Sequence, residues 1–177
     1  MKLGLLKCAI FASLVVSSCA TTAMASATIT FTGKVIDAAC TVVVNEGNST
    51  IDLGDTVKAD LAAKGNTGAP KAFDIALNSC PAAGAGIPTK AHIKFSGDTD
   101  GDPSYFKNTA SEAAPNVGVL LKQGSTVVKA DDDNDDIVLP SAGGNVTTHY
   151  TAQLVATNTG ADKGDVSAVL TYNVSYN

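Results

Sequence analysis

The segment AVLTYNVSYN, residues 168–177, carries apolar side chains at its even-numbered positions. These positions are Ala168, Leu170, Tyr172, Val174 and Tyr176. A period of two places them on one face of an extended chain, which is the pattern of a β-strand with one buried face. The segment therefore predicts a strand that runs to Asn177.

The same alternation recurs along the rest of the sequence. It is clear over residues 27–35, 73–77, 91–95 and 146–156, and shorter β-prone segments cover residues 41–44, 50–53, 117–121, 126–129 and 137–139. Turns rich in Gly, Asn and Pro separate these segments. Residues 56–64 would form a single helical turn at most. Many short strands without a sustained helical pattern predict one all-β domain, an antiparallel sandwich.

The N-terminal 25 residues have the features of a secretory signal peptide. Lys2 begins a short basic region, an apolar stretch covers residues 3–16, and Ala23-Met24-Ala25 forms a cleavage pattern before Ser26. We expect residues 1–25 to be removed. Two alternatives are a start at Thr21 and lipidation of Cys19. No later apolar stretch reaches the length of about 20 residues that a membrane-spanning helix needs.

The charge of the chain argues against nucleic-acid partners. Its 12 Lys and Arg stand against 17 Asp and Glu, a formal net charge of −5. Removal of residues 1–25 takes away Lys2 and Lys7, which changes this charge to −7. A surface of that sign repels nucleic acid and anionic membranes. We therefore expect neither partner.

Cys40 and Cys80 are the two cysteines that remain after residue 25. In an exported protein such a pair is expected to form a disulfide bond, with two free buried thiols as the alternative. The bond would close a loop of about 40 residues, and the chain-entropy model gives about 4 kcal/mol of stabilisation for it.

Patterns for catalysis or metal binding are missing from the sequence. His92 and His149 both lie in alternating, strand-like segments, and no glycine-rich phosphate loop or metal-ligand spacing is present. The acidic runs at residues 98–102 and 131–136 would suit calcium, but they lack the glycine and glutamate positions of an EF-hand loop. We interpret them as solvated loop tips. We predict no enzymatic activity, no cofactor and no metal site.

Several segments resemble one known family. Residues 28–40 combine alternating apolar residues with Gly33 and Cys40, and residues 51–54, 73–80 and 116–121 match further strands of that family. Tyr176 is the penultimate residue, and Gly164 is the fourteenth from the end. In this combination and order they resemble subunits of chaperone–usher pili, and in particular the type 1 fimbrial major (shaft) subunits.

The resemblance implies an incomplete immunoglobulin-like antiparallel β-sandwich, completed by a donor strand from a neighbouring subunit. Residues 26–38 would form the N-terminal donor-strand extension, and residues 39–177 the pilin domain. The donor strand would insert Ala27, Ile29, Phe31, Gly33 and Val35. The acceptor groove, which would also bind the chaperone, would involve Gly164, Ala168, Leu170, Tyr172, Val174, Tyr176 and Asn177.

The function implied is that of a structural subunit of an adhesive fimbria. Its partners would be other subunits, in a homopolymer, together with a periplasmic chaperone and an outer-membrane usher. It would be exported through the periplasm to an extracellular fimbrium. The sequence leaves open whether the subunit forms the shaft or a minor adaptor. An alternative from another class is a self-complete secreted β-sandwich that binds a carbohydrate or a protein.

Overall fold

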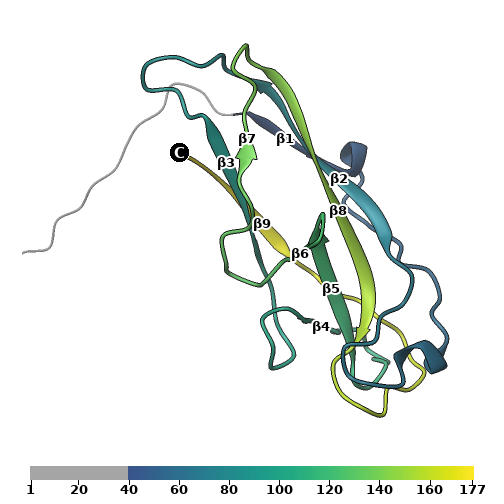
Figure 1. Ribbon diagram of the computed structural model, residues 1–177. Helices are drawn as coiled ribbons and strands as arrows, with labels where there is room; N and C mark the ends of the chain where they lie inside the picture. The colour runs from purple at the N-terminus through teal and green to yellow at the C-terminus, as the bar shows by residue number, and fades with distance from the viewer. Residues whose placement is uncertain (1–39) are drawn as a thin grey trace, which may run out of the picture. The chain divides into compact units, whose positions relative to one another are not determined.

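The computed structural model describes residues 40–177, which form two antiparallel sheets (Figure 1). The strands of this part are β1 (Thr41–Val44), β2 (Lys71–Cys80), β3 (Lys90–Ser96), β4 (Phe106–Lys107), β5 (Val117–Gln123), β6 (Thr126–Val127), β7 (Ile137–Val138), β8 (Gly144–Ala156) and β9 (Thr171–Tyr176). Two short 3-10 turns, η1 (Asn45–Gly47) and η2 (Lys58–Leu61), follow β1. Among these residues no helix is long and apolar enough to cross a membrane.

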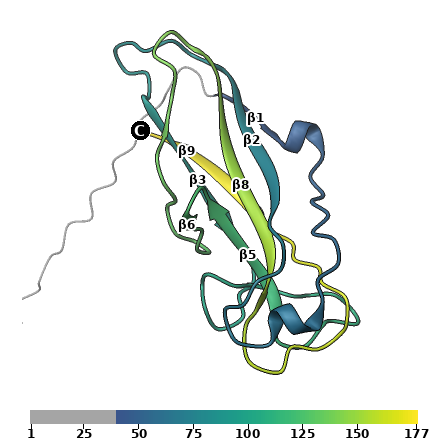
Figure 2. The ribbon, with the colours of Figure 1, turned by 45° about the vertical axis from the view of Figure 1, so that its right-hand side comes forward.

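The larger sheet has the strand order β1-β2-β8-β5-β4, with β6 paired to β5. The smaller sheet has the order β7-β3-β9. Figures 1 and 2 show β3 and β9 side by side, in a layer separate from β2 and β8. Every strand pair is antiparallel. The predicted all-β antiparallel sandwich is confirmed.

The core lies between the two sheets, and the period of two in the sequence explains how it forms. Phe73, Ile75 and Leu77 of β2 are buried, whereas the residues between them are half-buried. In β3, the buried side chains are those of residues 91, 93 and 95. Because successive side chains of a strand point to opposite faces, each strand presents one apolar face to the other sheet.

Tyr150 of β8 joins the two sheets at the centre of this core. Its side chain is only 1% exposed, and its ring stacks on Phe73 with 5.5 Å between centroids. The ring also meets Phe95 of the other sheet edge-on, at 5.4 Å. The Tyr150 hydroxyl has no hydrogen-bond partner among the described residues. Burial raises the pKa of this phenol, and the nearby Asp135 carboxylate raises it further.

Replacement Tyr150→Phe should therefore have little effect at neutral pH and a clear effect at alkaline pH. The lost hydroxyl is unpartnered, so the free energy of unfolding at pH 7 should stay the same or rise by about 1 kcal/mol. Because the pKa of Tyr150 is raised in the folded state, folding favours the protonated phenol. The stability that this phenol contributes is complete below the unfolded pKa of about 10, and it declines as the pH rises toward the folded pKa. Urea unfolding at pH 7 and pH 11 measures the effect. The free energy of unfolding should fall less between these two pH values in Tyr150→Phe than in the wild type or in the control Tyr105→Phe. An equal alkaline loss in all three proteins would contradict this account.

Some predicted boundaries are wrong. Residues 50–53 form no strand, because Asn48 and Asp52 accept hydrogen bonds from the backbone N–H groups of Thr50 and Gly54 and so favour local turns. β9 begins at Thr171 rather than at Ala168. The single helical turn expected within residues 56–64 is present as η2, which buries Leu61.

Candidate functional site, an open strand edge

β9 is paired on one side only. Its residues Thr171–Tyr176 face β3 in continuous register, and within residues 40–177 its other edge has no strand partner. β1 likewise ends the larger sheet, where it pairs with β2 alone. An unpaired edge offers rows of free N–H and C=O groups to which another strand can add.

Apolar side chains along these two edges are only partly buried. They pack against the core from the β1 side at Val42, Val44, Ile51 and Leu53, and from the β9 side at Val166, Ala168, Leu170, Val174 and Tyr176. Tyr172 is 44% exposed. By contrast, Ala91 and Ile93 of the neighbouring β3 are completely buried. The core therefore lacks a cover along the line between β1 and β9, which we call the groove.

Two hollows lie beside β9, and the first of them lies in the groove, since residues of both β1 and β9 line it. One, of about 270 Å³, is lined by Val42, Val44 and Tyr172 with neighbouring residues of β1 and η1. The other, of about 300 Å³, is lined by Phe106, Ala168 and Val169 with residues at the end of β3. A cavity of ~150 Å³ is enough to bind benzene. Each hollow is thus large enough for a bulky apolar side chain.

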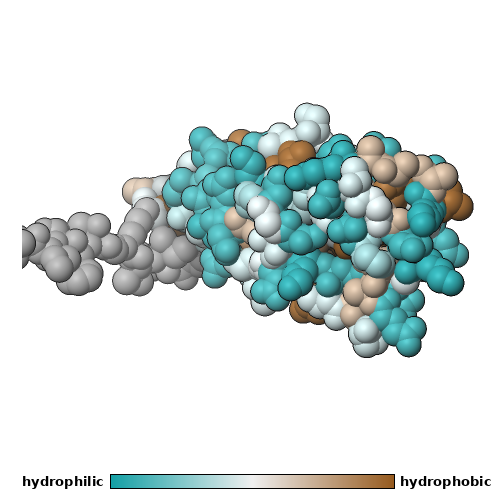
Figure 3. All heavy atoms as spheres, turned by 90° about the horizontal axis from the view of Figure 1, so that it is seen from below, coloured by the Kyte–Doolittle hydropathy of each residue, from teal (hydrophilic) through white to brown (hydrophobic). Residues whose placement is uncertain are grey.

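Other apolar groups on the surface are dispersed. Val57 and Val169 are strongly exposed, but the end of the domain seen in Figure 3 is largely hydrophilic, with its hydrophobic residues in separate small patches. Single exposed apolar residues are common on protein surfaces and need no partner, whereas a continuous apolar line indicates an interaction site. Within residues 40–177, the groove forms such a continuous apolar line.

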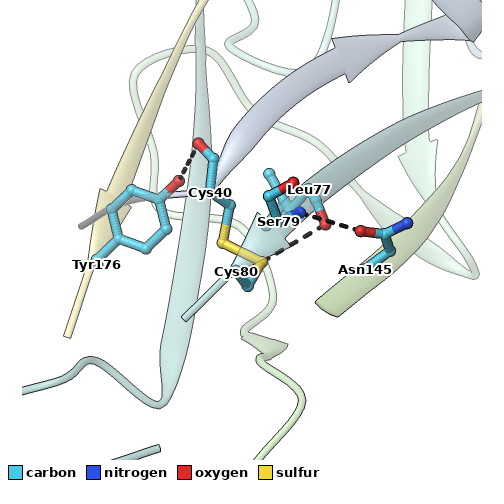
Figure 4. The surroundings of a disulfide bond; sticks show 6 residues. All are labelled: Cys40, Leu77, Ser79, Cys80, Asn145 and Tyr176. Carbon is cyan, nitrogen blue, oxygen red and sulfur yellow. Dashed lines mark hydrogen bonds between the residues drawn. A yellow bond between two sulfur atoms is a disulfide. The ribbon is translucent and has the colours of Figure 1, made fainter. Parts of the chain in front are cut away.

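The disulfide bond and Tyr176 define one end of the groove (Figure 4). Cys40 and Cys80 are joined as the sequence predicts, which ties the start of β1 to the end of β2. The Tyr176 hydroxyl donates a hydrogen bond of 3.4 Å to the Cys40 carbonyl, so the end of β9 is also held to Cys40. Burial raises the pKa of Tyr176, while the hydrogen bond to Cys40 acts in the opposite direction.

The remaining predicted site residues have different surroundings. Gly164 has a φ of +154°, and a Cβ at this position would lie 2.5 Å from the backbone nitrogen of Ala114. It therefore permits a close backbone crossing and lines neither hollow. Asn177 extends the pairing of β9, since its carbonyl accepts hydrogen bonds from the N–H groups of Thr89 and Lys90. The donor residues Ala27, Ile29, Phe31, Gly33 and Val35 lie outside the described residues, and their role stays a prediction.

Comparison with known proteins agrees with this geometry. The family model described as "Fimbrial protein" matches residues 29–177. The chain is 37% identical to the S-fimbrial protein subunit SfaA of Escherichia coli strain 536, over 74% of this chain and 75% of that protein. It is 31% identical to the long polar fimbria protein A of Salmonella typhimurium, over 97% of this chain and 98% of that protein.

Solved structures show the same fold. A subunit of a chaperone–usher pilus superposes with a TM-score of 0.65 at 25% identity, covering 89% of this chain and 99% of that chain. The P pilus rod subunit PapA also gives 0.65, at 24% identity, with 79% and 100% covered. The fold is that of the immunoglobulin-like pilins. The chain belongs to the fimbrial protein family, whose members are structural subunits of extracellular pili.

Proposed function

We propose that this subunit polymerises by donor-strand complementation, in which residues 26–38 of one copy fill the groove of the next. The observation that carries the proposal is the unpaired edge of β9, flanked by apolar side chains that are only half-buried. A strand added here would take up the free backbone groups of β9 and cover the groove at the same time.

The sequence of residues 26–38 supports the proposal. Ile29, Phe31 and Val35 fall on one face of an extended chain, so all three would point into the groove. Burial of each should contribute about 1.5–3 kcal/mol. Gly33, on the same face, would suit a place where the backbone of the neighbour approaches closely.

We further propose that a periplasmic chaperone covers the groove before assembly and that an outer-membrane usher exchanges the chaperone for the next subunit. An uncovered apolar edge would aggregate during export. The chaperone would contact Leu170 and, in β9, Tyr172, Val174 and Tyr176, and would bind Asn177. We assign the subunit no enzymatic role. The self-complete binding module is not favoured, because the described domain ends its smaller sheet at an uncovered β9.

Replacement Leu170→Ala should weaken the binding of a donor segment. Leu170 is a half-buried groove residue, and its truncation should remove about 2 kcal/mol of binding energy, or about 30-fold in affinity. The dissociation rate of a labelled peptide of residues 26–38 from a domain of residues 39–177 would measure the effect. The control is Val138→Ala on β7, where the side chain is 69% exposed and away from the groove. Equal dissociation rates for both variants would contradict the position of the groove.

A further inference from the structure

The acidic run Asp131–Asp136 lies against β3. The apolar side chains of β3 point into the core, and its polar side chains point the other way. Each of these polar side chains contacts an aspartate of the run: Lys90 Nζ to Asp136 at 2.5 Å, His92 Nδ1 to Asp136 at 3.3 Å, Lys94 Nζ to Asp133 at 3.3 Å, and Ser96 Oγ to Asp131 at 2.5 Å. The aspartates of the run are exposed to solvent, as predicted, but the run also contacts β3 along its whole length.

The same segment also occupies the backbone acceptors at one edge of β3. The short strand β7 pairs only with Lys90 and Ala91. Beyond it, the Asn134 side-chain amide donates a 2.6 Å hydrogen bond to the Ile93 carbonyl, and the Asp131 N–H donates a 2.8 Å bond to the Phe95 carbonyl. Just before the start of β3, the Leu139 N–H donates a hydrogen bond of 2.9 Å to the carbonyl of Thr89. An irregular segment therefore closes an edge that no full strand covers.

The two edges of the smaller sheet consequently differ. The outer edge of β9 is unpaired among the described residues, whereas the outer edge of β3 is covered by residues 131–139. β3 has seven residues, and an uncovered strand of that length would be a second place for a strand to add. Addition there would join subunits in a wrong arrangement.

We propose that Asp131–Asp136 acts as an edge guard, which keeps a donor segment from adding to β3 and so directs strand addition to β9. The part of this proposal that names the donor segment rests on the proposed function. The acidic composition suits the task, because a run of carboxylates repels its own copies and is held in place by Lys90 and Lys94.

The test reverses the two cations that hold the guard. The variant Lys90→Glu/Lys94→Glu would repel the aspartates, while Lys71→Glu/Lys163→Glu makes the same change of charge at exposed lysines elsewhere. Both would be prepared as the chain from Ser26 and kept with saturating peptide of residues 26–38, which blocks the β9 edge. Sedimentation with a labelled peptide should show either a second peptide bound per subunit or at least about tenfold more associated species in the first variant than in the control, because the peptide or another subunit can add to the opened β3 edge. Equal peptide binding and equal distributions would overturn the proposal.

Hydrogen exchange supplies a second readout that does not depend on association. The Asp131 amide should exchange at least about tenfold faster in Lys90→Glu/Lys94→Glu, while the amides of β5 and β8 keep their wild-type rates and show that the fold is intact. An unchanged Asp131 rate would overturn the proposal. If the β5 and β8 amides also become fast, Asn134→Ala replaces the double variant, because it removes only the bond to the Ile93 carbonyl. It must then show more association or more bound peptide than the wild type for the proposal to stand.

The outcome for the guard can be separated from that for the proposed function. If the peptide of residues 26–38 leaves association of the wild-type chain unchanged, donor-strand complementation at β9 fails. The comparison between the two lysine variants still reports on the β3 edge in that case, because both contain the same peptide and carry the same charge.

Discussion

A subunit that carries Phe31→Asp is expected to form no fibres. Phe31 is the bulkiest side chain on the proposed donor face, and it would enter the groove between β1 and β9. The substitution removes about 3 kcal/mol of apolar burial and places a carboxylate against apolar side chains, which adds several kcal/mol. Electron microscopy of surface fibres and sedimentation of the purified subunit would measure the loss of assembly.

The neighbouring residue provides the control for this variant. In an extended donor strand Thr30 would point to the face opposite Phe31, so Thr30→Asp should assemble as the wild type does. The Phe31→Asp subunit should also still bind a wild-type peptide of residues 26–38, since its own groove is unaltered. Normal fibres from Phe31→Asp would show that the donor assignment of Phe31 is wrong.

A domain of residues 39–177 is expected to melt at a much lower temperature alone than with the donor peptide. Burial of Ile29, Phe31 and Val35 together is worth about 5–9 kcal/mol before the cost of ordering the peptide. In a domain of this size each kcal/mol raises the melting temperature by about 3–4 °C, so the peptide should raise it by about 15 °C or more. Thermal unfolding with the disulfide formed, over a titration of the peptide, measures the shift.

The control for this titration is a peptide of the same composition with a scrambled order, which should give no shift. The rise in melting temperature with the native peptide should reverse only slowly after dilution. The peptide must break all its backbone hydrogen bonds to the domain at once before it can dissociate. A domain that is already stable alone and shows no rise would be a self-complete sandwich. That result would favour a free binding module.

The strands were predictable because their burial follows the period of two so regularly. Residues 73–77 and 91–95 alternate in the sequence, and the structure buries every second side chain of both. Residues 50–53 also alternate between polar and apolar residues but become irregular, because the Asn48 and Asp52 side chains accept hydrogen bonds from the backbone N–H groups of Thr50 and Gly54. β4 has only two residues, too few to leave a periodic signal.

No local sequence pattern indicates that the groove is open. The alternation over residues 168–176 is the same whether the cover comes from this chain or from another one. The unpaired edge of β9, the exposure of Tyr172 and the partial burial of Leu170 reveal that residues 40–177 do not supply the cover. The resemblance to pilus subunits therefore contributed what the residue pattern alone left open.

The acidic run at residues 131–136 shows a different limit. These aspartates are solvated, as the sequence predicts, but the structure also pairs Asp136 with Lys90 and Asp133 with Lys94, about 40 residues away, which the sequence did not indicate. Contacts between distant segments depend on the topology of the sheet, which the local pattern does not contain. Gly164 is a similar case, since the reason for a glycine there is the backbone of residues 112–114.

The position of the disulfide bond has a mechanical consequence. In a fibre joined as proposed, tension would reach each subunit through residues 26–38 and enter the domain at Cys40. The bond would carry this load directly to Cys80, across a sequence separation of 40 residues. The segment between the two cysteines would then bear no tension. Fully extended, this segment would span about 130 Å. A pulled fibre would lengthen by that amount per subunit only after reduction, so the bond limits how far each link of the chain can be drawn out.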